Sequence, residues 1–250
     1  MRHRHESPEA CSKQMQAIRL AFSDASLIAC LMTDHIAILT GDLVGSTDAP
    51  AGRVSDTMIL LAAIAREIGP DCRFTRHRGD GWQMALTEPG DCLWACLYIL
   101  ARLRADPDAL PSRIAAGIGA YHPTDATDLS TAMGPAFTAS GRALDQMARG
   151  QYLALSGKKT EIDRFRKLAF AFAEEHALRW SKEQAEAMAH ALHPDAPTQE
   201  QIAQALGISR QAVGLRLKAA GYHVLDQACL AFRAEPILPL SQETPPDPAP

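Results

Sequence analysis

Two aspartates, each beside a glycine near the end of a strand pattern, are the residues of this sequence best placed for chemistry. Asp42 follows an apolar run that begins at Ile36, and Asp80 lies in the turn Gly79-Asp80-Gly81. A carboxylate at the end of a buried strand is costly unless a partner binds it. Two carboxylates at neighbouring loop ends can hold Mg²⁺, with nucleotide phosphates filling its other positions. Taken singly, each also has a plainer interpretation as the acceptor of an ordinary turn.

The two aspartates can meet only if the surrounding elements form one sheet. The sequence pattern predicts strands from Ile36 and over 72–77, 82–86, 113–121 and 152–155, and helices over 53–68, 92–104 and 135–149, the last capped by Gly150. This order predicts an α+β protein with a ferredoxin-like split βαβ sheet, helices on one side, and an additional helix and strand. In that topology the second hairpin strand lies antiparallel beside the first strand. We therefore expect Asp42 and Asp80 at the same edge of the sheet.

Composition limits the classes of function. The chain has 250 residues, 47% of them hydrophobic, and 25 Lys and Arg against 29 Asp and Glu, so any nucleic-acid binding must be local. No apolar run is long enough to cross a membrane. The six cysteines are scattered and form no C-x-x-C pair, which is typical of reduced thiols in a cytoplasmic protein.

The chain divides into four predicted parts. Residues 1–31 are an N-terminal extension that makes a poor signal peptide, and one hypothesis is that translation naturally begins at Met32. Residues 32–157 form the strand-containing domain and 161–234 an all-helical domain. The Pro-rich tail 235–250 is expected to be disordered.

The most specific pattern is TQEQIAQALGISRQAVGLRL, from Thr198 to Leu217. Thr198 is placed to cap a helix, Gly207 to make a turn and Ser209 to cap the next helix. This spacing is typical of a DNA-binding helix-turn-helix, which would bind a two-fold site as a homodimer. A helical hairpin used for dimerisation or packing is the alternative. The candidate DNA contacts are Ser209, Arg210, Gln211, Gly214, Arg216 and Lys218.

A third group of polar residues recurs along one helix. Thr138, Arg142, Asp145 and Arg149 are spaced by three and four, and Gly134-Pro135 leaves free N–H groups suited to an anion. An ordinary solvated face with an Arg142–Asp145 pair is the alternative.

The segments TGDLVGST, RGDGWQMAL, RIAAGIGAY and GPAFTASGRAL together resemble the class III nucleotide cyclase domain, which has a palm-like fold. The resemblance implies that Asp42 and Asp80 hold Mg²⁺ and that Arg142 steadies the phosphates of a nucleotide. Two positions depart from the cyclase pattern: Thr138 stands in place of an asparagine, and Phe74 falls about where an adenine-reading lysine is found. The candidate nucleotide contacts are Gly41, Gly45, Ser46, Thr47, Gly79, Thr138 and Arg142.

From Met32 to Leu225 the chain resembles the SatD family more closely. The shared features are the Gly-Asp opening followed by Ser46, the Gly-Asp hairpin, the GIG strand, the GPAF helix and the C-terminal helix-turn-helix. The family has no settled biochemical function, and from the two predicted domains we expect a regulator of the SatD type in which a domain that binds nucleotide and Mg²⁺ is coupled to DNA binding. A divalent-metal-dependent nucleotide cyclase or nucleotidyl transferase, and a non-catalytic adaptor, are the alternatives.

Overall fold

The computed structural model describes residues 35–77, 79–120, 129, 132–158 and 162–234, which belong to one compact unit. The predictions for residues 1–31 and 235–250 lie outside these ranges. None of the helices described is both long and apolar enough to cross a membrane.

A five-stranded sheet forms the centre of the fold. Its strands are β1 (His35–Leu43), β2 (Arg73–Arg76), β3 (Gly81–Leu86), β4 (Ser112–Ala120) and β5 (Leu153–Ser156), in the order β2-β3-β1-β4-β5. The first four pair antiparallel, and β5 runs parallel to β4. The predicted α+β class is confirmed, and the first four strands have the order of a split βαβ sheet.

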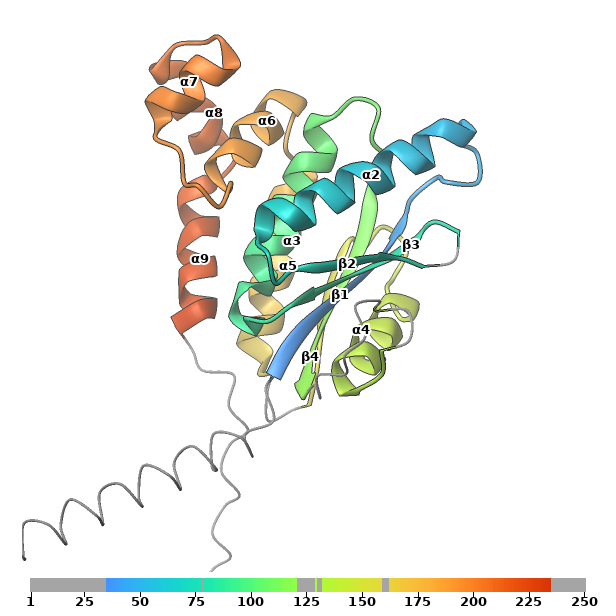
Figure 1. Ribbon diagram of the computed structural model, residues 1–250. Coiled ribbons are helices and arrows are strands. Elements are labelled where there is room, and N and C mark those ends of the chain that lie inside the picture. The colour runs from blue at the N-terminus through green and yellow to red at the C-terminus, as the bar shows by residue number, and fades with distance from the viewer. Residues whose placement is uncertain (1–34, 78, 121–128, 130–131, 159–161, 235–250) are drawn as a thin grey trace, which may run out of the picture. The chain divides into compact units, whose positions relative to one another are not determined.

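Helices cover both faces of the sheet (Figure 1). The crossover helices α2 (Ala51–Ile68) and α3 (Cys92–Ala105) lie on one face, and the additional helix α4 (Pro135–Asp145) lies on the other. We expected helices on one side, but β1 and β4 are apolar on both faces and need cover on both. A Cβ built on Gly117 of β4 would lie 2.2 Å from the carbonyl oxygen of Ala136, so the glycine permits the close approach of α4.

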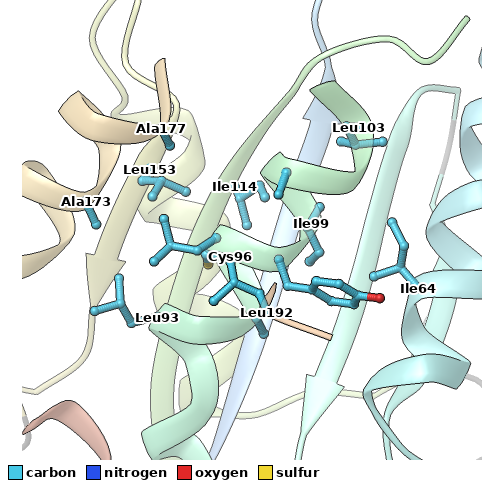
Figure 2. Close-up of a cluster of buried hydrophobic side chains, with 14 of the residues drawn as sticks. Ile64, Leu93, Cys96, Ile99, Leu103, Ile114, Leu153, Ala173, Ala177 and Leu192 are labelled. Atoms are coloured by element: carbon cyan, nitrogen blue, oxygen red, sulfur yellow. The ribbon is translucent and has the colours of Figure 1, made fainter. Parts of the chain in front are cut away.

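The C-terminal part is helical throughout, as predicted. It contains α5 (Arg164–Leu178), α6 (Lys182–Ala191), α7 (Gln199–Leu206), α8 (Arg210–Ala219) and α9 (Tyr222–Ala234). One cluster of buried side chains runs from the sheet through α3 into these helices, and Figure 2 shows Ile114, Leu153 and Cys96 facing Ala173 and Ala177 of α5. The predicted helical domain therefore shares its core with the sheet.

Two element boundaries differ from expectation, and both concern candidate site residues. β1 continues past Gly41 to Leu43, because β3 and β4 pair with it on both sides, so Asp42 lies within the strand. α4 ends at Asp145, and Gly150, with a φ of 84°, lies in the following turn rather than capping the helix. Arg149 is therefore not on the helical face that carries Arg142.

Candidate functional site

A pocket of about 380 Å³ opens at the C-terminal end of β1. Four segments line it: residues 42–47, Asp80, Arg113 and residues 148–152. Three of these come from the ends of β1, the β2–β3 hairpin and β4, and the fourth is the turn between α4 and β5. Residues that are more than 100 positions apart in sequence therefore share one concave surface.

Strand register brings the acidic residues together. Asp42 lies opposite Gly81 on β3 and opposite Arg113 on β4. Asp80 is the residue before Gly81, and its carbonyl oxygen accepts a hydrogen bond from the Leu43 N–H at 3.2 Å. Asp42 and Asp80 consequently line the same pocket, at the edge of the sheet where the topology placed them.

Trp82 packs against this end of β1, on the face of the sheet away from the Asp42 side chain. Its ring is fully buried, and its Nε1–H donates to Ser112 Oγ at 2.9 Å. Ser112 Oγ in turn lies 2.7 Å from the carbonyl oxygen of Asp42. A Cβ on Gly41 would lie 2.4 Å from the Trp82 ring, so Gly41 is explained by packing on the face away from the pocket.

Arg113 is the direct partner of Asp42. Its Nε donates to Asp42 Oδ1 at 2.8 Å, and a terminal nitrogen donates to Oδ2, which makes the pair bidentate. Both side chains are about one-third exposed or less, at 34% for Arg113 and 27% for Asp42. The hydrogen bond to Asp42 raises the pKa of Arg113 against the opposing effect of desolvation. The carboxylate of Asp42 thus already has a cation in this structure.

Asp80 is held by a second contact: its Oδ2 accepts the hydroxyl of Ser46. A Mg²⁺ ion requires near-octahedral oxygen ligands, and here both oxygens of Asp42 are bonded to a guanidinium. Among the described residues, no group of three or more His, Cys, Asp or Glu side chains gathers where it could hold a metal ion. Asp42 and Asp80 alone therefore do not form a complete Mg²⁺ site, and the nucleotide phosphates expected from the sequence would have to supply the remaining oxygen ligands.

The predicted nucleotide contacts fall into two groups. Gly45, Ser46 and Thr47 line the pocket beside Asp42 and Asp80, whereas Gly41, Gly79, Thr138 and Arg142 are outside its lining. Thr138 and Arg142 are exposed on α4, and the Thr138 hydroxyl donates to the Gly134 carbonyl at 3.2 Å. The α4 hydroxyl that contacts the sheet is that of the buried Ser140, whose Oγ lies 2.7 Å from Thr40 Oγ1.

Two arginines that line the pocket, Arg113 and Arg149, were not predicted to lie beside Asp42 and Asp80. The position of Arg113 near the end of β1 could have been predicted, because the antiparallel pairing of β1 and β4 brings the start of β4 beside the end of β1. Only the register, which the sequence pattern does not give, makes it the partner of Asp42. Arg149 was assigned to the wrong surroundings because α4 ends one turn earlier than its spacing suggested.

The α7–α8 segment has the local geometry expected of its sequence. The Thr198 and Gln201 side chains form a reciprocal capping box, Gly207 has a φ of 64°, and the Ser209 hydroxyl accepts the Ala212 N–H at 3.2 Å. Val213 and Leu217 are buried, so one side of α8 packs inward.

The outward side of α8 differs in part from expectation. Ser209, Arg210, Gln211 and Lys218 are exposed, and Gly214 is partly buried. Arg216 turns toward α6, where its terminal nitrogen lies 3.4 Å from Glu186 Oε2. Leu215, 69% exposed, stands on the surface that we expected to be polar.

No protein-family model and no curated protein matches the sequence. Solved structures that are similar to part of the fold include two cyclases. The active GGEEF domain of a diguanylate cyclase from Vibrio cholerae is 15% identical, with 56% of this chain and 91% of that domain covered and a TM-score of 0.38. A bacterial light-regulated adenylyl cyclase is 15% identical, with 60% of this chain and 57% of that protein covered and a TM-score of 0.34. Likeness of this degree assigns no activity, so functional conclusions rest on the geometry of the chain itself.

Proposed function

We propose that the pocket at the end of β1 binds a nucleotide through its phosphates. The observation that carries the proposal is the convergence of Arg113 and Arg149 on one pocket of about 380 Å³. This volume falls in the range of about 300 to 1,000 Å³ that is usual for small-molecule sites. The Gly45–Thr47 turn lines the same pocket and allows a ligand to approach the backbone closely.

Arg113 is the residue that would orient the phosphates. Asp42 engages Nε and one terminal nitrogen, so the other terminal nitrogen can donate to a phosphate oxygen. The bidentate pair fixes the guanidinium plane before a ligand arrives, which lowers the conformational entropy lost on binding. Asp80 is negatively charged and would repel the phosphates. We therefore expect the phosphates to lie toward Arg149 rather than toward the hairpin.

Calorimetry with ATP and GTP, with and without Mg²⁺, tests this proposal. Arg113→Met should weaken nucleotide binding by about 10-fold or more, because a charge-assisted hydrogen bond is lost. Arg142→Met is the matched control, since it removes an arginine of α4 that is outside the pocket. No binding by the unaltered protein, or equal losses in the two variants, would contradict the proposal.

The second candidate is a divalent-metal-dependent nucleotide cyclase or nucleotidyl transferase acting in the same pocket. The presence of both Asp42 and Asp80 in its lining favours this candidate over an adaptor with no ligand. Incubation with each labelled nucleoside triphosphate and Mg²⁺ separates turnover from binding alone. Product that disappears in Asp42→Ala would establish catalysis, whereas tight binding without product would leave the pocket as a sensor.

For the α7–α8 segment, we propose DNA binding coupled to the state of the pocket. The supporting observation is the exposed, positively charged start of α8, with Arg210 and Gln211 directly after the Ser209 cap. In gel-shift titrations of the full chain, Arg210→Ala should weaken binding, and Arg216→Ala should have less effect because Arg216 faces α6. Binding that is absent at every salt concentration would remove this proposal.

A further inference from the structure

The outer face of α5 carries an apolar stripe. Phe165, Leu168 and Phe172 are 74%, 48% and 67% exposed, although the helix buries Phe170, Ala173 and Ala177 on its other side. Spacing of three and four places the exposed three in one line along the helix. Large apolar side chains gathered in this way mark an interaction site, of the kind that binds another protein or a membrane.

The stripe is symmetric about its own centre. Phe165 and Phe172 lie about 10 Å apart along the axis, at a rise of about 1.5 Å per residue, with Leu168 between them. A two-fold axis through the middle of the stripe would therefore place Phe165 of one copy against Phe172 of the other. Such a self-complementary patch is what an isologous contact requires.

Charge along α5 favours the same antiparallel arrangement. Arg164 and Lys167 lie in the N-terminal half, and Glu175 lies in the C-terminal half. Arg164 and Glu175 are eleven residues, or about three turns, apart, so they stand on the same flank of the stripe. In the antiparallel pair each Arg164 would lie within about 3 Å, along the axis, of Glu175 in the other copy. Glu175 pairs with Arg179 of its own helix and would gain a second cation.

From these observations we propose that α5 is a dimerisation surface, and that its partner is α5 of a second copy of this chain packed antiparallel. The positive N-terminal end of each helix dipole would also lie beside the negative C-terminal end of the other, which contributes a small favourable electrostatic energy. A nucleic acid is not the expected partner, because the N-terminal half of the helix is basic and the other half is acidic. The proposal is independent of any ligand in the pocket.

Sedimentation equilibrium of the full chain, from about 5 to 200 µM, tests the proposal across the range of Kd expected for a small interface. The unaltered protein should show a dimer, and Phe165→Glu/Phe172→Glu should raise Kd by about 100-fold or more. Ile59→Glu is the matched control, because Ile59 is 65% exposed but lies on α2. Circular dichroism should show that both variants stay folded, since the changed side chains are exposed.

The charged flank provides a second test of the antiparallel register. Arg164→Glu and Glu175→Arg should each weaken the dimer, and the two changes together should restore it. A monomer throughout the concentration range, or a dimer indifferent to the phenylalanine changes, would overturn the proposal. If the phenylalanine changes weaken the dimer but the Arg164→Glu/Glu175→Arg double variant does not regain affinity, the antiparallel packing would be overturned.

Discussion

The pocket at the end of β1 and the outer face of α5 present opposite situations. In the pocket, Asp42 is already bonded to Arg113, and Asp80 to Ser46. On α5, Phe165 and Phe172 remain mostly exposed in the described part of the chain. A ligand of the pocket therefore meets polar side chains that are already held by hydrogen bonds inside the protein, whereas a partner of α5 gains from new apolar burial. The first surface suits a charged small molecule and the second another protein surface.

The largest effect is expected where the sheet beside the pocket is packed most tightly. Gly117→Ala should destabilise the fold by about 2 to 4 kcal/mol, because the new methyl group would meet the α4 backbone at Ala136. Gly141→Ala, on α4 with open space around it, should instead stabilise the fold by about 0.5 to 1 kcal/mol. Urea unfolding measures both. Equal effects would mean that the close contact between α4 and β4 does not govern the stability of this sheet.

The free energy of unfolding should fall at alkaline pH, because several cysteine thiols lie in or beside the core that the sheet shares with the C-terminal helices. Burial raises the pKa of Cys72 and Cys229 to about 12, and raises the pKa of Cys92 and Cys96 as well. The unfolded chain ionises these thiols near pH 8.5, so their stabilising contribution is complete below that pH and is lost as pH rises.

A thiol that ionises in the unfolded chain but stays protonated in the folded protein should lower the free energy of unfolding by about 1 kcal/mol between pH 7 and pH 9.5. The urea midpoint should fall accordingly, and the fall should be smaller in Cys96→Ala. An unchanged midpoint would show that these thiols are not protected by the core.

The Asp42–Arg113 pair should contribute a smaller amount, because it is partly exposed. A double-mutant cycle with Asp42→Asn and Arg113→Gln should give a coupling free energy of about 1 kcal/mol that decreases with salt. Zero coupling at low salt would mean that the pair does not hold Arg113 in position, and would weaken the case for a preorganised phosphate site.

The smallest effect on the monomer is expected at the face of α5. Phe172→Ser should change the free energy of unfolding by less than about 0.5 kcal/mol at concentrations where the chain is monomeric. Its effect should grow with protein concentration, because only association buries this side chain. A large loss of stability in the dilute protein would show that Phe172 packs within the chain, and would remove the contrast between the two surfaces.

Local chemistry in the sequence determined the elements and their caps. The Thr198 capping box, the Gly207 turn and the Ser209 cap follow from residues within a few positions of one another, and the structure has each of them. The strand predicted over 113–121 is likewise present as β4. The order of elements also sufficed to place Asp42 and Asp80 at one edge of the sheet.

Only the tertiary structure decided what those residues meet. The register of β1 and β4 made Arg113 the partner of Asp42, and the early end of α4 brought Arg149 into the pocket instead of Arg142. The packing of α5 also decided which of its phenylalanines is buried and which two are exposed. Side-chain periodicity sets which residues share a face, but register, helix ends and the choice of buried face depend on contacts between segments far apart in the chain.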